Sequence, residues 1–141
     1  MTKPFASLVT GGAAGIGAHL CQSLLEQGHH VVTIDCNQPS YSHPHLTYIA
    51  CDLFDTAATA KAAAHISEQF KIHHFIHNAG SIRANLIEAI SADDLLALSQ
   101  LHIGAAVIFI QAVLPDLKTS SGGRIVLLSS RAALGAITRT A

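Results

Sequence analysis

The sequence predicts an α/β fold built on a doubly wound parallel sheet that is truncated after about five strands. Short runs of strand-forming residues alternate with helix-forming segments along the 141 residues, which is the order of strand–helix–strand units. Residues 125–128, Ile-Val-Leu-Leu, show no polar alternation. An apolar run of this kind is expected where helices cover both faces of a sheet.

The first half of the chain supplies three strands and one helix. Residues 5–10 form a short apolar run that ends at glycines, and residues 31–34 are β-branched. A helix is predicted over residues 17–27 because leucines recur on one side, and Gly28 follows as a stop. Two prolines disfavour a long helix before the third strand at residues 46–50.

The second half supplies two helices with recognisable starts and two more strands. Asp55 can cap an alanine-rich helix. Ser91 and Asp94 have the spacing of a capping box, which opens a long helix. The predicted elements are a helix over residues 56–70, a strand over 72–77, a helix from 91 to about 114 and a strand over 124–129.

The last predicted strand indicates whether the chain is a complete domain. If it ended the sheet, a flat apolar edge would be open to other chains, which is an aggregation hazard. Residues 132–141 continue without a helix stop or a polar tail. We therefore expect residues 1–141 to be an incomplete domain of a longer parent protein. The alternative is a small complete domain with a covered edge.

Composition excludes several classes of protein. Half of the residues are hydrophobic and 12% are charged, so a packed interior is expected. The net charge is −1 without a basic run, so nucleic acid is not an expected partner. No signal peptide is visible, and residues 103–114 are too short an apolar stretch to span a bilayer. Cys21, Cys36 and Cys51 are odd in number and far apart, as expected of reduced thiols in the cytoplasm.

A glycine-rich turn follows the first strand and precedes the first helix, reading Thr-Gly-Gly-Ala-Ala-Gly-Ile-Gly over residues 10–17. Gly11 permits a tight turn, while Gly15 and Gly17 remove side chains where a pyrophosphate and the neighbouring strand approach. The helix amino terminus offers N–H groups to phosphate oxygens. The pattern predicts a Rossmann-type dinucleotide site, and a turn without a ligand is the alternative.

Asp35 ends the second strand. A carboxylate at this place can accept hydrogen bonds from the adenosine ribose hydroxyls and would repel a 2′-phosphate. No arginine or lysine closely follows it. The sequence therefore favours NAD, with NADP less favoured, although Asp35 could also be an ordinary turn residue before Asn37.

Five segments in register resemble the short-chain dehydrogenase/reductase family, and the similarity covers the whole chain. They are the Thr10–Gly17 turn, Cys51-Asp52-Leu53, Asn78-Ala79-Gly80, Gly123-Arg124-Ile125-Val126 and Ser129-Ser130. The resemblance implies an NAD(P)-dependent oxidoreductase that transfers a hydride between a nicotinamide and a small alcohol or carbonyl substrate.

The resemblance also assigns cofactor contacts. The family's adenine-contacting aspartate matches Asp52, and the Asn-Ala-Gly segment borders the cofactor. His77 stands where the family usually has asparagine, and a histidine can still donate one hydrogen bond there. The expected cofactor-binding residues are Thr10, Gly11, Gly15, Ile16, Gly17, Asp35, Asp52, Leu53, Asn78, Ala79 and Gly80.

Two catalytic positions are implied, and two lie outside the sequence. Ser130 matches the serine that hydrogen-bonds the substrate, unless it only ends a strand. His102 falls at the family's structural-catalytic asparagine, where an imidazole could hold a relay water or could be a half-buried histidine without a catalytic part. The family's catalytic tyrosine would stand one or two positions after Ala141, followed four residues later by a lysine. This chain alone is expected to bind cofactor at best.

Other signals are secondary. The histidine clusters lack cysteine or carboxylate neighbours at ligand spacing, so no metal is expected. Arg83 could meet an anionic substrate or could be solvated. The long helix favours a homo-oligomeric parent, as in the family. Two rival functions remain: a non-catalytic dinucleotide-binding or regulatory protein ending at Ala141, and an epimerase or lyase that does not consume its NAD.

Overall fold

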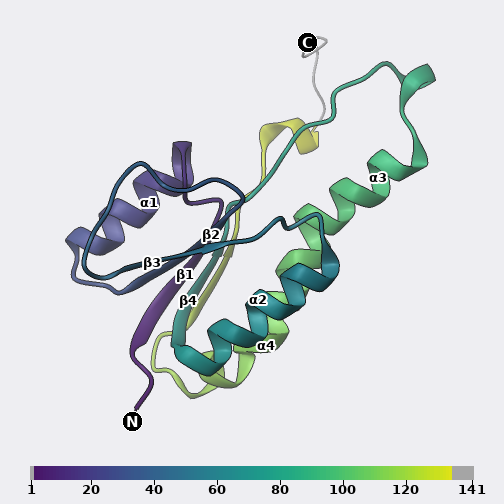
Figure 1. The fold of residues 1–141 in the computed structure, drawn as a ribbon. Helices are drawn as coiled ribbons and strands as arrows, with labels where there is room; N and C mark the ends of the chain where they lie inside the picture. Colours follow the sequence, from purple (N-terminus) through teal and green to yellow (C-terminus); the bar gives the residue numbers. More distant parts are fainter. Residues whose placement is uncertain (1, 135–141) are drawn as a thin grey trace.

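The computed structural model describes residues 2–134, which form one parallel sheet with helices on both of its faces (Figure 1). The strands are β1 (Phe5–Thr10), β2 (Val31–Asp35), β3 (Leu46–Ala50), β4 (Lys71–His77) and β5 (Arg124–Leu127). The α-helices are α1 (Gly15–Glu26), α2 (Thr56–Gln69), α3 (Ala92–Ser99) and α4 (Ala105–Thr119). The predicted Rossmann-type sheet is confirmed.

The strand order is β3-β2-β1-β4-β5. The chain builds outward from β1 to β3 and then returns to the other side of β1, so the winding reverses between β1 and β4. Thr10 is in register with Ile34 on one side and with His77 on the other. The segments that follow β1, β2 and β4 therefore leave the sheet where the carboxyl ends of the strands lie, which we call the carboxyl edge. They lie beside the reversal point where doubly wound sheets bind ligands.

Two apolar layers hold the helices to the sheet. On one face, Val9 and Val31 pack with Cys21 and Leu25 of α1. On the other face, α2 and α4 pack on each other and on the sheet through a larger core that includes Phe109. Figure 1 shows α1 alone on one side and α2 with α4 on the other. Burial on both faces explains why β1 and β2 lack polar alternation.

The long helix differs from its prediction in two ways. A π-turn, η2 (Gln100–Gly104), separates α3 from α4, and α4 continues past Pro115 to Thr119. Tertiary packing overrides the proline, because Val113 and Leu117 on its two sides are buried in the core. The whole run, Ala92–Thr119, is long and apolar enough to cross a membrane by length and composition. Within this run, α4 makes the contacts with α2 and β4, and 28% of the most apolar 18-residue window is buried.

Two other element boundaries differ slightly from their predicted positions. The first helix starts at Gly15, two residues earlier than predicted, because the Ala14 carbonyl oxygen already accepts a hydrogen bond from the Ala18 N–H at 3.2 Å and so closes the first helical turn. The fifth strand ends at Leu127.

The expectation that helices cover both faces of β5 is wrong within the described residues. All four residues of β5 are exposed, and Val126 is 45% exposed. The reason is that β4 is the only described element in extensive contact with β5, so no described helix covers its faces. The predicted absence of a helix stop in residues 132–141 lies largely outside the described residues, which end at residue 134.

Candidate functional site: a crevice at the carboxyl edge of the sheet

A crevice of about 470 Å³ opens where β1, β2 and β4 end. Its lining comes from the turn after β1, the end of β2, the segment after β3 and the segment after β4. It is lined by Gly11, Ala14, Gly15, Ile34, Asp35, Cys36, Asn37, Cys51, Asp52, Leu53, Phe54, Asn78, Ala79, Gly80, Ser81 and Leu101. The structure thus gathers eight predicted site residues, which are Gly11, Gly15, Asp35, Asp52, Leu53, Asn78, Ala79 and Gly80.

The glycine turn is open towards the crevice. Gly11 and Gly15 have positive φ angles of 72° and 55°, which L side chains rarely adopt. A Cβ atom at Gly15 would meet nothing within 4 Å. Helix α1 starts without a side-chain cap, so its first N–H groups are free for an anion.

Gly17 serves packing rather than ligand contact. A Cβ atom there would collide with the Gly11 carbonyl oxygen and with the Asn78 amide. Gly17 and Thr10 are buried behind the turn and do not line the crevice. Ile16, on the exposed start of α1, does not line it either.

Asp35 lines the crevice and is already oriented by its neighbours. Its Oδ2 accepts a hydrogen bond from the Ala13 N–H at 3.0 Å, and its Oδ1 accepts one from the Asn37 N–H at 2.9 Å. The Cys36 thiol donates to Oδ1 at 3.6 Å, and burial together with the Asp35 charge raises the pKa of that thiol. A carboxylate has about four acceptor sites, and these three contacts leave about one of them for a hydroxyl donor.

Tyr41 supports the glycine turn, a role that the sequence did not reveal. Its hydroxyl donates to the Gly12 carbonyl oxygen at 2.7 Å. Burial, and then the hydrogen bond with Cys21, raise the pKa of Tyr41, which keeps its hydroxyl a donor. A Cβ atom at Gly12 would collide with the Thr33 hydroxyl. No local pattern links residue 41 to residue 12, so only the tertiary structure could show this contact.

Thr10 and Asn78 connect β1, β4 and the turn. The Thr10 hydroxyl oxygen accepts hydrogen bonds from the Asn78 and Ala79 N–H groups, both at 3.1 Å. The Asn78 side-chain amide donates to the carbonyl oxygens of Thr10 at 3.2 Å and Gly11 at 3.0 Å. His77 is buried beside them, and its Nδ1 lies 2.9 Å from the Thr10 hydroxyl oxygen.

His102 sits in the π-turn, next to the crevice rather than in its lining. Its Nε2 lies 3.0 Å from the Ser81 carbonyl oxygen. A Cβ atom at Gly80 would come within 3.0 Å of the His102 ring. The segment after β4 therefore rests against this imidazole. π-turns recur at functional sites in helices.

Ser130 is exposed and does not line the crevice. It follows β5 at the carboxyl edge of the sheet, three residues after the strand ends at Leu127. Its hydroxyl accepts a hydrogen bond from the Ala132 N–H at 3.2 Å. The described residues thus bring the cofactor candidates together but do not join Ser130 to them.

Asp52 and Leu53 line the crevice, and Arg83 lies beside it against Phe54. Asp52 Oδ1 accepts a hydrogen bond from the Phe54 N–H at 2.9 Å, and Leu53 is buried. Arg83 is exposed to solvent, as in one of the two alternatives, and it also has partners within the chain. It forms an ion pair with Asp94 at 2.8 Å, and its guanidinium lies over the Phe54 ring at 5.1 Å.

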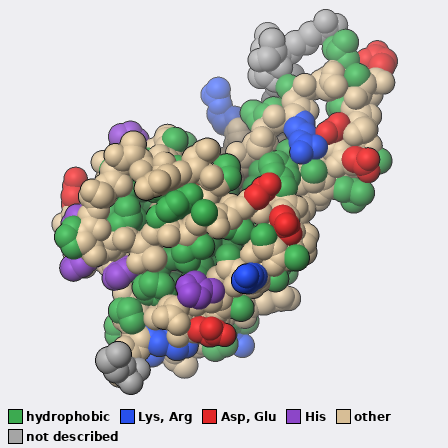
Figure 2. Space-filling view, in the orientation of Figure 1, with side chains coloured by type: hydrophobic (Ala, Val, Ile, Leu, Met, Phe, Trp, Pro, Cys, Tyr) green, Lys and Arg blue, Asp and Glu red, His purple; other side chains and the backbone are tan. Residues whose placement is uncertain are grey.

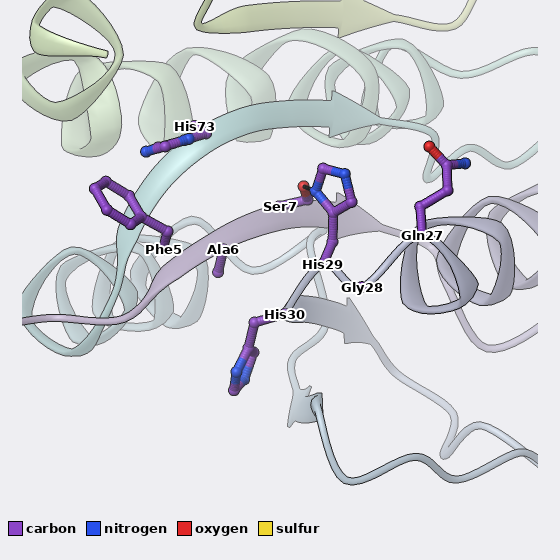
Figure 3. A pocket seen from close by; sticks show the side chains of 8 residues that line it. All are labelled: Phe5, Ala6, Ser7, Gln27, Gly28, His29, His30 and His73. Carbon is purple, nitrogen blue, oxygen red and sulfur yellow. Dashed lines mark hydrogen bonds between the residues drawn. The ribbon is translucent and has the colours of Figure 1, made fainter. Parts of the chain in front are cut away.

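A second hollow, of about 240 Å³, lies at the opposite, amino edge of the sheet (Figure 3). The ring of His29 lies beside Ser7, whose hydroxyl oxygen is 3.2 Å from His29 Nδ1 and 3.1 Å from His74 Nδ1. Burial, and then the charges of His29, His73 and Arg124, lower the pKa of His74. Within residues 2–134, no cluster of three or more potential ligands could hold a metal ion.

Comparison with known proteins places these features in a family. The family model described as short chain dehydrogenase matches residues 6–141. D-threitol dehydrogenase of Mycolicibacterium smegmatis is 28% identical over 141 residues, which cover 93% of this chain and 54% of that protein.

Solved structures agree. A short chain dehydrogenase family protein from Francisella tularensis superposes with a TM-score of 0.83 at 26% identity, covering 98% of this chain and 55% of the other. A short chain dehydrogenase from Burkholderia cenocepacia in complex with NADP superposes with a TM-score of 0.79 at 26% identity, covering 97% and 60%. The chain spans about half the length of these relatives. It belongs to the short chain dehydrogenase family.

Proposed function

We propose that this chain binds NAD in the carboxyl-edge crevice and forms the cofactor-binding part of an oxidoreductase that interconverts an alcohol and a carbonyl compound. The observation that carries the proposal is the Asp35 carboxylate, which lines a crevice bordered by an open glycine turn. Family membership supports an NAD(P)-dependent oxidoreductase. NAD rather than NADP is the more specific proposal, because a carboxylate at this place disfavours a 2′-phosphate.

The residues present suit a dinucleotide. The N–H groups at the uncapped start of α1 would bind the diphosphate, and Asp35 would accept a hydrogen bond from a ribose hydroxyl. Asp52 and Leu53 would border the adenine, and Asn78 would hold the turn in shape through its two carbonyl contacts. Bound NAD would supply the hydride acceptor.

The chemistry would need groups from more than one segment. We propose that Ser130 hydrogen-bonds the substrate oxygen, and that a tyrosine–lysine pair in a carboxy-terminal continuation of the parent exchanges the proton. His102 would border the nicotinamide end through its contact with residues 80 and 81.

Cofactor titration tests the proposal. NADH should bind the protein more tightly than NADPH, as measured by the change in nicotinamide fluorescence. Asp35→Asn keeps one acceptor oxygen but removes the charge. Since hydrogen bonds to charged groups contribute about 1.5–3 kcal/mol, this variant should lose about tenfold or more in NADH affinity. Its preference for NADH over NADPH should be smaller than that of the unmodified protein.

Asp93→Asn removes an equivalent charge from the exposed start of α3 and should leave both affinities unchanged. Tighter binding of NADPH than NADH by the unmodified protein would overturn the role given to Asp35.

The main rival is a dinucleotide-binding protein without catalysis. Reading the gene beyond Ala141 separates the two: a Tyr-x-x-x-Lys sequence supports the enzyme, and a stop codon supports the rival. Assay of the full-length parent with NAD and a panel of alcohols then identifies the substrate class. An epimerase or lyase would hold NAD without net consumption.

We also propose a homo-oligomeric, cytoplasmic parent. Leu96, Ile103 and Val107 are exposed on the α3–α4 run at helical spacing, which suits a subunit contact. On the face drawn in Figure 2, basic side chains are scattered and form no stripe. Sedimentation and cell fractionation of the full-length parent test the two statements.

A further inference from the structure

His77 is a buried histidine with both ring nitrogens engaged. It is 4% exposed at the end of β4. Its Nε2 lies 3.1 Å from the Leu101 carbonyl oxygen, in the π-turn, and its Nδ1 lies 2.9 Å from the Thr10 hydroxyl oxygen, on β1. The imidazole therefore bridges the long helical run to the central strand, directly behind the crevice.

The partners decide the protonation state of the ring. A carbonyl oxygen can only accept, so Nε2 must carry a proton. The Thr10 oxygen already accepts from the Asn78 and Ala79 N–H groups, which use its two lone pairs. The Thr10 hydrogen is then the only one left to fill the contact with Nδ1, and Nδ1 must accept it. The geometry thus requires a neutral imidazole in the Nε2–H tautomer.

The same hydrogen bonds extend to the cofactor-binding segments. Thr10 holds the backbone at residues 78 and 79, and Asn78 holds the glycine turn. On the other side of the ring, Nε2 contacts the Leu101 carbonyl oxygen. The next residue, His102, contacts the segment after β4. A proton added to Nδ1 would face the Thr10 hydroxyl and disrupt this whole series of contacts.

We propose that His77 is a positioning residue that shapes the dinucleotide crevice only as a neutral imidazole, so that its protonation releases the cofactor as the pH falls. The inference rests on the proposed dinucleotide site, and it goes beyond that site by giving it a built-in pH response.

The groups around His77 determine the direction in which its pKa is shifted. The titratable side chain that faces His77 is His102, from η2, while β1 and β5 present Thr10 and Leu127 in register. Burial lowers the pKa of His77, the Leu101 carbonyl opposes this, and His102 lowers the pKa further. A histidine pKa below 6.5 leaves the ring neutral near pH 7. The crevice is therefore intact at neutral pH and lost as the pH falls through this lowered value.

The test compares NADH affinity from about pH 7.5 to about pH 5 in the full-length protein and in His77→Gln. Glutamine supplies one acceptor and one donor but does not titrate. The dissociation constant of the unmodified protein should rise by up to about tenfold per pH unit below the His77 pKa, because one proton is taken up on release. In His77→Gln the profile should be flat over this range.

The matched control is His65→Gln, which removes an exposed histidine on α2 and should keep the pH response. ¹⁵N NMR of the imidazoles should show His77 as the Nε2–H tautomer at neutral pH. An identical pH profile in the unmodified protein and His77→Gln, or an Nδ1–H tautomer, would overturn the inference. Absence of NADH binding at neutral pH would instead refute the proposed function, and the NMR readout would still judge the tautomer.

Discussion

At the scale of single residues, the glycine turn shows that neighbouring glycines can have different physical reasons. Gly15 has a positive φ and open space around it, which leaves room for a ligand. Gly17 is enclosed by the Gly11 carbonyl and the Asn78 side chain, so its missing Cβ atom allows β1, β4 and α1 to meet. The spacing of the motif is the same whether a glycine serves a ligand or packing.

Gly17→Ala should therefore reduce the free energy of unfolding by about 2 kcal/mol, the usual effect of forcing a methyl group into a filled site. It should also weaken NADH binding, because the added methyl group displaces the turn. Urea unfolding and cofactor titration measure the two effects.

Gly28→Ala is the matched control. Gly28 also has a positive φ, of 85°, but a Cβ atom there meets nothing within 4 Å. This variant should lose about 1 kcal/mol from backbone strain alone and keep its NADH affinity. Equal behaviour of the two variants would contradict the packing role of Gly17.

At the scale of secondary-structure elements, the starts of α2 and α3 were local and predictable. Asp55 caps α2 by accepting from the Ala58 N–H at 2.9 Å, and Ser91 with Asp94 forms the expected capping box of α3. The π-turn between α3 and α4 had no such signal. It is supported from outside the helix, by the His77 contact with Leu101 and by the Gln100 amide, which donates to the Leu53 carbonyl at 3.3 Å.

Asp55→Ala should lower the free energy of unfolding by about 1 kcal/mol, because the first turn of α2 loses its side-chain acceptor. Asp55→Asn keeps an acceptor oxygen, so its free energy of unfolding should fall by only a few tenths of a kcal/mol. Thermal unfolding of the two variants measures the difference. A loss as large for asparagine as for alanine would show that charge, rather than the cap hydrogen bond, stabilises this helix end.

At the scale of the whole molecule, the two outermost strands of the sheet, β3 and β5, differ in exposure. The β3 side is partly buried, with its four leading residues at intermediate exposure. The β5 side is exposed throughout and apolar from Ile125 to Leu128. An apolar edge strand with free hydrogen-bonding groups is a template for pairing with another chain.

The 141-residue chain should therefore self-associate with increasing concentration, and Val126→Lys should reduce this association by placing a charge on the edge. Ile87→Lys changes an exposed apolar side chain between β4 and α3, away from both β5 and the α3–α4 surface, and is the control. Analytical ultracentrifugation measures the association of each variant. If Val126→Lys reduces association no more than Ile87→Lys does, the edge-strand prediction is wrong.

The sequence by itself determined the fold class, the element order and the residues of the glycine turn. These features depend on local chemistry: β-branched runs, caps and the backbone freedom of glycine act within a few residues of one another. The sequence also indicated Asp35, because the end of the second strand in such a sheet lies beside the turn.

Only the tertiary structure decided which side chains meet across the sheet. The contacts of Tyr41 with Gly12 and of His77 with Thr10 and Leu101 join residues 24 to 67 positions apart, and no periodicity encodes such pairs. Exposure of β5 was also decided at this level, because an apolar strand has the same sequence at the centre of a sheet and at its edge. Pairing and burial depend on what the rest of the chain places beside a residue, and this information is not local.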